Sequence, residues 1–392
     1  MKMSRSFHYV HEATVVAFPL HSGNVAMPPI RGVLAGGLFV LALNAATAVA
    51  QDTPSSIPPD GKKPISQMSL EELMNVDVVS VNVLGTHVHL AKQWMISYEP
   101  TVMRMDGTRE GTQSITTSEI LTRYEMAPAS MTTGMHMGMV MYAPSDDLTL
   151  SASVPYLRKR MTHITRDGMR MAEESRGFGD VAVGALYSVH SVRSYRHRFI
   201  INAGLTLPTG SVEAVDVAGE MPHDPGEPLD YTMQLGSGTV DVLPGVTYLG
   251  HTANWAFGSD VIPRIRLGTN SRGYRFGHQL RANAWAARRV TDWVSLSGRV
   301  DTNAVGAIHG ADPALDPMMS PMSDPAIQGG KTVDAAVALE FYVPKGGLKG
   351  QRIAVEAWWP MYQSYDGPQL ETSWQLRVGW QWVFYGPRRD TR

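Results

Sequence analysis

The sequence of 392 residues contains no cysteine. Disulfide bridges, thiolate metal sites and cysteine nucleophiles are therefore excluded. The sequence also has no large excess of charge of one sign, since 34 basic and 36 acidic side chains leave a formal net charge of -2. Such a balance gives no electrostatic bias towards a polyanion, so nucleic acid is not an expected partner.

Catalytic signatures are also missing. The sequence has no His-Glu-x-x-His pattern, no Gly-x-Ser-x-Gly pattern and no complete phosphate-binding loop. Gly177 and Gly179 are followed neither by a third glycine at dinucleotide-site spacing nor by a helical pattern. The sequence therefore predicts a protein that is not an enzyme and needs no cofactor.

Long apolar runs are scarce, and the one strong run covers residues 32–50. It follows Arg31 and ends in Ala48-Val49-Ala50, which is the small-x-small pattern of a signal-peptide cleavage site. A membrane anchor fits less well, because the run is short and a Pro-rich stretch follows it. Residues 1–50 are therefore predicted to hold a signal peptide, with Met27 as an alternative start, and the mature chain to be exported.

Residues 51–84 are predicted to form a periplasmic linker with one short helix. Ser69 and Glu72 have the spacing of a capping box, which satisfies backbone amides at a helix start. Residues 85–385 are predicted to be one domain, and residues 386–392 a C-terminal tail.

From about residue 93 the hydrophobic pattern has a period of two, which indicates β-strands. Most of the predicted strands have about the 9 to 13 residues that a tilted membrane-crossing strand needs. Twelve strands are predicted, near residues 93–105, 132–143, 147–158, 178–190, 195–207, 240–250, 253–266, 275–289, 293–305, 332–343, 351–362 and 372–385.

The connections between these strands alternate between short and mostly long. Short ones lie near residues 144–146, 191–194, 251–252, 290–292 and 344–350, and long ones near 106–131, 159–177, 208–239, 267–274, 306–331 and 363–371. Such alternation is typical of antiparallel barrels in the outer membrane of Gram-negative bacteria, with both termini on the periplasmic side. The predicted fold class is therefore all-β, a transmembrane barrel of about twelve strands.

Aromatic residues sort towards the two ends of the predicted strands, as expected where a barrel meets the headgroup zones. The set at the short-turn ends is Trp94, Tyr142, Tyr187, Tyr195, Tyr248, Trp255, Trp285, Trp293, Tyr342, Trp382 and Tyr385. The set at the opposite ends is Trp358, Trp359, Tyr362 and Trp374.

The two faces of the strands differ in polarity. In the last strand Trp374, Leu376 and Trp382 share one face, while Gln375 and Arg377 share the other. Charges of both signs on the second face predict a hydrated or ion-paired lumen, and hence passage or uptake of a small molecule. A plugged structural or enzymatic barrel is a further alternative. The candidate lumen-lining residues are Arg275, Arg281, Arg299, Asp301, Asp334, Glu340, Arg352 and Arg377.

Two segments, 177–181 and 201–210, resemble the outer-membrane family named for the MetA pathway of phenol degradation. A Met- and His-rich branch of that family is similar at residues 85–89, 94–98, 103–107 and 135–146, and the likeness spans most of residues 85–385. The resemblance implies a transporter-like, porin-like barrel and a hydrophobic or aromatic substrate. Outer-membrane lipid and the barrel assembly machinery would be its partners.

Methionine is concentrated in one part of the chain, because twelve of its 23 methionines fall between residues 95 and 171. Thioethers favour Cu(I) and imidazoles can hold Cu(II), so a copper-handling protein is the alternative function. Its candidate ligands are His87, His89, Met103, Met105, Met135, His136, Met137, Met139 and Met141. Alternatively, the methionines face lipid as ordinary hydrophobes. A period of two cannot decide which face points inward.

Overall fold

The structure is a computed structural model that describes residues 86–192, 197–217, 228–252 and 254–385. Side chains are not described at residues 190–192. The predicted signal peptide, the linker with its helix near residues 69–74, and the tail at 386–392 all lie outside the described residues.

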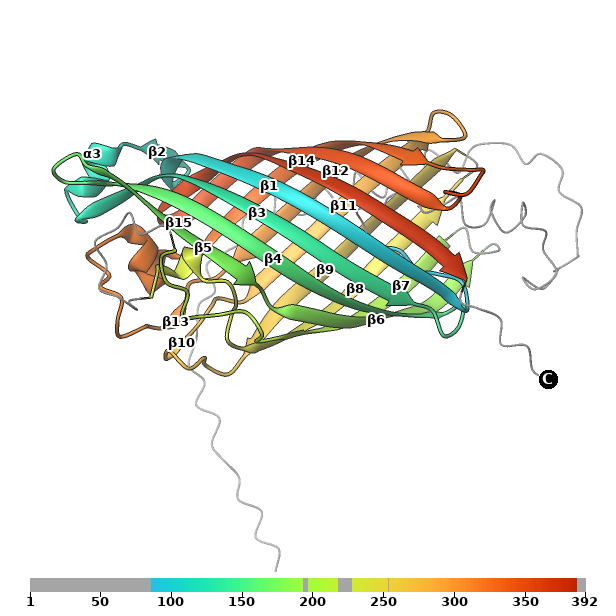
Figure 1. The fold of residues 1–392 in the computed structure, drawn as a ribbon, viewed down its shortest axis with the longest axis horizontal. Coiled ribbons are helices and arrows are strands. Elements are labelled where there is room, and N and C mark those ends of the chain that lie inside the picture. The colour runs from blue at the N-terminus through green and yellow to red at the C-terminus, as the bar shows by residue number, and fades with distance from the viewer. Residues whose placement is uncertain (1–85, 193–196, 218–227, 253, 386–392) are drawn as a thin grey trace, which may run out of the picture. The chain divides into compact units, whose positions relative to one another are not determined.

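A closed ring of antiparallel strands forms the body of the molecule (Figure 1). Each strand pairs with its neighbour along the chain, and β15 pairs with β1 to close the ring. The elements of the ring are β1 (Gln93–Gly111), β3 (Met126–Tyr142), β4 (Leu148–Thr165), β6 (Val181–Val192), β7 (His197–Leu207), β8 (Val240–His251), β9 (Trp255–Leu267), β11 (Gln279–Arg289), β12 (Val294–Val305), β14 (Gly330–Tyr342) and β15 (Gln351–Tyr385).

The element β15 crosses the barrel twice. Its first part is antiparallel to β14 and its second part is antiparallel to β1. Directions alternate around the ring from β1 to β14, so β14 and β1 run in opposite directions and one straight strand could not be antiparallel to both. The chain therefore reverses between Gln363 and Thr372, which are joined by two hydrogen bonds of 2.8 and 3.2 Å.

Eleven elements, one of which makes two passes, give twelve passes in the wall. The prediction of an all-β antiparallel barrel of about twelve strands is thereby confirmed. The prediction of one long loop at 159–177 was wrong. There β4 continues to Thr165 and pairs with β5 (Arg170–Phe178). The many charges in this segment suit a two-stranded extension in water. Because of them the segment lacks an apolar alternation, so the hydrophobic pattern did not predict these strands.

All smaller elements lie in the long connections, and hence at one end of the barrel, called here the long-loop end (Figure 1). The opposite end is called the short-turn end. A capping box of Thr116 and Glu119 begins the five-residue helix α3. These elements are β2 (Gln113–Ile115), α3 (Thr117–Leu121), η3 (Tyr231–Met233), β10 (Tyr274–Arg275), β13 (His309–Gly310), η4 (Pro321–Ser323) and η5 (Pro325–Ile327).

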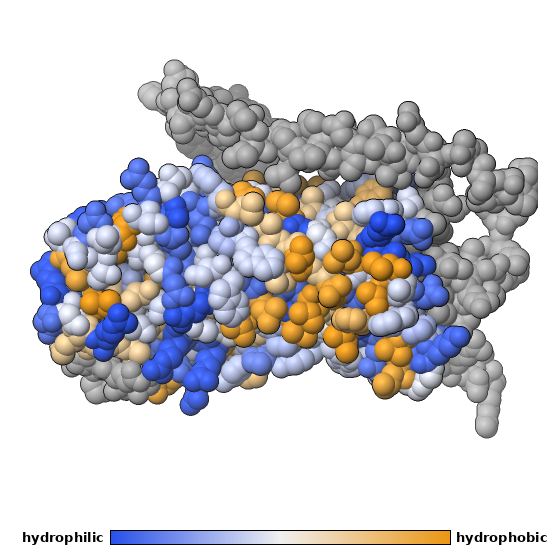
Figure 2. Space-filling view, turned by 90° about the horizontal axis from the view of Figure 1, so that it is seen from above, coloured by the Kyte–Doolittle hydropathy of each residue, from blue (hydrophilic) through white to orange (hydrophobic). Residues whose placement is uncertain are grey.

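The exterior of the barrel carries an apolar zone. Figure 2 shows hydrophobic residues gathered over the middle and the half away from the long loops, whereas the long-loop end is mostly hydrophilic. On β14, Val337 and Leu339 are exposed while Ala338 and Glu340 between and beside them are buried. A closed ring satisfies its own backbone groups, and an apolar exterior suits lipid, so the fold is that of a transmembrane β-barrel. Among the described residues no helix is long and apolar enough to span a membrane.

Most of the predicted belt aromatics are exposed, including Trp94, Trp293 and Trp359. Tyr195 lies outside the described residues, Tyr142, Tyr248 and Tyr342 are half-buried, and two tryptophans are buried. Trp285 and Trp358 are only 8% and 6% exposed and lie inside the barrel. Trp285 takes the space beside Gly258, where a Cβ would come within 2.9 Å of the indole.

Candidate functional site

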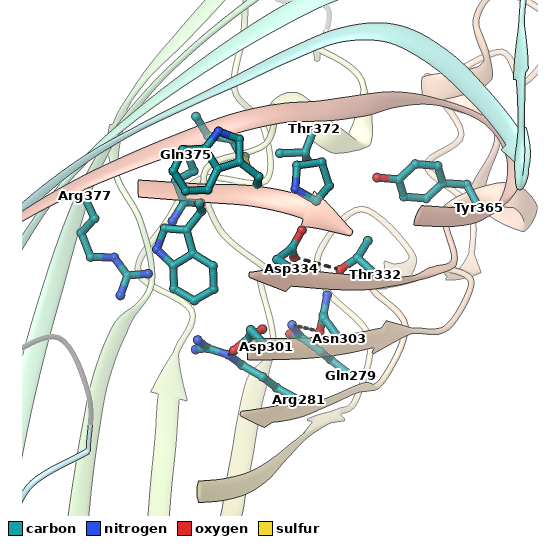
Figure 3. A pocket seen from close by; sticks show the side chains of 14 residues that line it. Gln279, Arg281, Asp301, Asn303, Thr332, Asp334, Tyr365, Thr372, Gln375 and Arg377 are labelled. Atoms are coloured by element: carbon teal, nitrogen blue, oxygen red, sulfur yellow. Dashed lines mark hydrogen bonds and ion pairs between the residues drawn. The ribbon is translucent and has the colours of Figure 1, made fainter. Parts of the chain in front are cut away.

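A cavity of about 410 Å³ lies against the inner face of the barrel. Its lining comes from β11, β12, β14, both passes of β15, and β1, which are neighbours in the ring. Figure 3 shows Arg281, Asp301 and Asp334 reaching this space from three neighbouring strands. The lining is mainly polar and bears both signs of charge.

Hydrogen bonds order one side of the cavity. Arg281 Nε lies 2.7 Å from Asp301 Oδ2, and Gln279 Nε2 donates to Asn303 Oδ1 at 2.7 Å. By contrast, Asp334 accepts a long bond of 3.4 Å from Thr332 Oγ1 and makes no ion pair within 4 Å in the described part of the chain. Asp334 is therefore a negative charge offered to the cavity.

Beside the cavity, one carboxylate joins two passes of β15 to β12. Glu356 Oε1 lies 3.2 Å from Arg299 Nε, and its Oε2 lies 3.6 Å from Arg377 Nη1. The indole Nε1 of Trp358 also donates to Glu356 at 2.8 Å. Both guanidinium groups lie over the Trp358 ring, at 5.8 and 5.6 Å from its centroid, within the range of cation–π attraction. The cluster fixes an aromatic face inside a charged lumen.

The structure places most of the predicted lumen-lining residues on inward faces. Arg281, Asp301, Asp334 and Arg377 line the cavity, and Arg299 belongs to the Glu356 cluster. Glu340 and Arg352 lie on inward positions nearer the short-turn end, where Arg352 stands 5.5 Å from the ring of Tyr342.

Arg275 is a correction to that set. It lies on β10, outside the ring, where β10 pairs with β13 in a separate two-stranded sheet. The predicted strand at 275–289 begins in the structure at Gln279, and just before it Gly277 approaches the backbone of Gly306 so closely that a Cβ would not fit.

Two long loops fold against inward residues at the long-loop end. Leu229 and Met233 from one loop and Met322 from the other pack in one buried cluster. The wall contributes Met131, Met161 and Leu370, with Met105 packed beside them. Backbone N of Asp312 donates to Tyr231 Oη at 2.9 Å, which fastens the two loops to each other.

Residues 86–92 occupy the short-turn end on the inner side of the wall. Thr86 Oγ1 lies 3.5 Å from the inward carboxylate of Asp260. Further along, His89 N donates to Thr149 Oγ1 at 3.1 Å and Ala91 N donates to Asp146 Oδ1 at 2.8 Å. Both ends of the lumen are thus partly occupied by chain.

The methionines of β1 and β3 face inward. On β1, Met95 is buried between the exposed Trp94 and the half-buried Ile96, and it pairs directly with Met141 on β3. Directly paired residues share a face, so Met135, Met137 and Met139 face the lumen together with Met103. The alternative in which these methionines face lipid does not hold.

His136 is a correction to the candidate metal ligands. It lies on the outer face of β3, where its Nδ1 is 2.6 Å from the hydroxyl oxygen of Tyr98. His87 and His89 instead lie inside, 9% and 5% exposed, with ring centroids 5.0 Å apart. Burial, and after it the nearby His87 and Arg352, lowers the pKa of His89 well below its usual value.

Sequence reasoning missed one buried cluster at the long-loop end. Single ligand atoms of His163, Glu173 and Asp230 all lie within 4.8 Å of one another, with His163 Nε2 3.1 Å from Glu173 Oε1. His163 and Glu173 come from the paired strands β4 and β5, and Asp230 comes from a distant loop. No local spacing could have joined them.

No family model matches the sequence, and no curated protein matches it. Among solved structures, the fold is similar to an outer-membrane channel from Pseudomonas putida F1, with a TM-score of 0.53 and 14% identity over 76% of this chain and 97% of that chain. The toluene transporter TodX of Pseudomonas putida is another similar structure, with a TM-score of 0.39 and 9% identity over 76% of this chain and 91% of that chain. The likeness shows the fold, and the resemblance to the phenol-degradation family is not confirmed.

Proposed function

We propose that this chain is a non-enzymatic channel of the bacterial outer membrane through which a small polar solute crosses, including solutes that carry an aromatic ring. The observation that supports it is the cavity of about 410 Å³ on the inner wall. A dry core would hold packed apolar side chains, whereas this lining offers Asp334, the Arg281–Asp301 pair and neighbouring amides to a solute.

The ring preference follows from Trp358. Its indole is held by Glu356 and lies beside two guanidinium groups, so a flat solute with a polar substituent finds a stacking face and hydrogen-bond donors together. A phenol or an aromatic acid has that chemistry. Outer-membrane lipid surrounds the wall, and the barrel assembly machinery inserts it.

The test is single-channel recording of the purified protein in a planar bilayer, together with flux of phenol and benzoate into proteoliposomes. Discrete current steps and solute flux are expected. Heat-modifiable migration on SDS gels verifies that the barrel is folded. A folded barrel that gives neither current steps nor solute flux would refute the channel proposal and leave the plugged barrel as the alternative.

Cation selectivity gives a sharper test. Replacing Asp334 by Asn removes a cavity charge that has no ion-pair partner within 4 Å among the described residues, so the ratio of cation to anion permeability should fall about twofold or more. Reversal potentials under a KCl gradient measure it. The matched control is Asp292→Asn, an exposed carboxyl in a short turn, which should leave the ratio unchanged.

Orientation is also part of the proposal, with the short turns and both termini in the periplasm. Because the chain has no cysteine, single cysteines can be labelled without background. In intact cells a membrane-impermeant maleimide should label Asp167→Cys at the long-loop end. It should label Asp292→Cys only after the outer membrane has been permeabilised. The reverse pattern would refute the orientation.

A further inference from the structure

Methionine side chains form a continuous column on the inner wall. The pairs Met95–Met141 and Met105–Met131 join β1 to β3 near their two ends. The pair Met131–Met161 extends the column onto β4. Residues two apart on a strand lie roughly 7 Å apart on one face, so neighbouring thioethers are within reach of each other. The members on β1 and β3 are Met95, Met103, Met105, Met131, Met135, Met137, Met139 and Met141.

At the short-turn end the column meets two histidines. His87 Nε2 lies 3.1 Å from Met95 Sδ, and the side-chain amide nitrogen of Gln381 lies 2.8 Å from the same His87 nitrogen. The His89 ring stands nearly perpendicular to the His87 ring, at an interplanar angle of 87°. The same amide nitrogen of Gln381 also contacts Met95 Sδ, so one imidazole nitrogen and one thioether meet there, with the second imidazole ring 5.0 Å away between centroids.

This space is built and enclosed. Met95 is fully buried, Gln381 is 1% exposed and His89 is 5% exposed. His89 Nε2 is buried and has no hydrogen-bond partner in the described part of the chain. A buried ring nitrogen without a partner costs free energy, and a bound cation would satisfy it.

The donor set selects the kind of cation. Thioether sulfur is a soft, uncharged donor that suits Cu(I), whereas Ca²⁺ and Mg²⁺ take oxygen ligands. The chain has no cysteine, so methionine supplies all of its sulfur donors. Ag⁺ has the same charge and a similar preference for sulfur, and it is a redox-inert probe of such a site.

We propose that His87, His89 and Met95 bind a soft monovalent cation of the Cu(I) type, with Met141 completing the site from the adjacent strand. The methionine column supplies successive weak thioether sites between this position and the long-loop end. Binding at the site does not depend on the channel proposed above, whereas a role of the column in passage rests on it.

The test is a calorimetric titration of the detergent-purified, full-length protein with Ag⁺ in chloride-free buffer. Saturable binding is expected, weakened at least tenfold in Met95→Leu and in His89→Gln. The matched controls are Met361→Leu, whose side chain is 71% exposed, and His136→Gln on the outer face. Both controls should bind as the unchanged protein does.

A second readout needs no variant at the site. With ¹³C-methyl methionine, Ag⁺ should shift some of the methionine methyl resonances and leave the others in place. The resonance that disappears in Met361→Leu should be one that Ag⁺ does not shift. Unshifted methyl resonances, or unchanged affinity in both Met95→Leu and His89→Gln, would overturn the site. Retained Ag⁺ binding in a protein that passes no solute would separate this site from the channel.

Discussion

At the scale of single residues, the inner wall depends on a few carboxylates that serve several partners at once. Glu356 is only 1% exposed, yet it contacts Arg299, Arg377 and the Trp358 indole. A buried ion pair stabilises a fold little more than well-packed apolar side chains would. Removing one partner is nevertheless costly, because it leaves an uncompensated charge in a site with little water. The stability of the barrel should therefore depend on the charge of Glu356, even when a substitution keeps the size of the side chain.

Glu356→Gln should lower the free energy of unfolding by about 3 to 5 kcal/mol, because two nearly buried guanidinium groups lose their common carboxylate. Urea unfolding in detergent micelles, followed by tryptophan fluorescence, measures this loss. Glu110→Gln is the control, since its pair with Arg123 is exposed at 39% and 44% and should contribute at most about 1 kcal/mol. Equal losses in the two variants would contradict the importance of burial.

At the scale of elements, each strand must present lipid on one face and the lumen on the other. Val337 in the middle of β14 is 53% exposed on the outer face, whereas Asn303 on β12 lines the inner cavity. The two positions lie on paired strands, with Val337 opposite Gly298 in mid-strand and Asn303 nearer the long-loop end, and they face different media.

Val337→Lys should therefore destabilise the barrel by about 2 to 4 kcal/mol, the cost of a lysine near the bilayer midplane. Asn303→Lys should be tolerated, because Asp301 and Asp334 line the same cavity. Folding yield into lipid vesicles, scored by heat-modifiable migration, compares them. The lipid-facing assignment of β14 would be wrong if Val337→Lys folded as well as Asn303→Lys.

The sequence predicts the strands well for the same reason. Alternation of Val333 and Val337 with Asp334 is enough to identify β14 and its lipid face, because the two media differ so strongly. Alternation could not decide the face of β3, where methionines oppose His136 and Val140 and both sides look apolar. Only the register with β1, whose face is clear from Trp94 and Glu99, resolved it.

Contacts between distant segments were beyond prediction. Asp230 reaches His163 and Glu173 through the folding of a long loop, and residues 86–92 meet Asp260 across the short-turn end. Neither contact has a local pattern. The inward direction of Trp285 and Trp358 could have been predicted, since a period of two places them on the faces of the lumen-lining candidates Arg281 and Arg352; their positions in the strands suggested the exposed belts instead.

At the scale of the whole molecule, the loops that pack at the long-loop end restrict access to the lumen. Residues 312–328 contribute Met322 to the buried cluster and Asp312 to the bond with Tyr231. They lie outside the ring of strands, so the wall does not need them.

Replacing residues 312–328 by a short Gly-Ser linker should therefore raise the single-channel conductance severalfold while the barrel still forms. Bilayer recording measures the conductance, and heat-modifiable migration verifies the wall. The control replaces the exposed turn at 345–349, at the opposite end, which should leave the conductance as it was. No rise in the first variant would show that the narrowest point lies elsewhere.

The ring closes where its first strand meets its last. Gln93 Nε2 bonds to Tyr385 Oη at 3.2 Å, across 292 positions of sequence. Without the second pass of β15, β1 has no neighbour on that side and its amides and carbonyls stay unpaired, which a hydrocarbon environment does not tolerate. A premature stop codon that removes the second pass of β15 should therefore yield material for periplasmic proteases and no shortened but working pore.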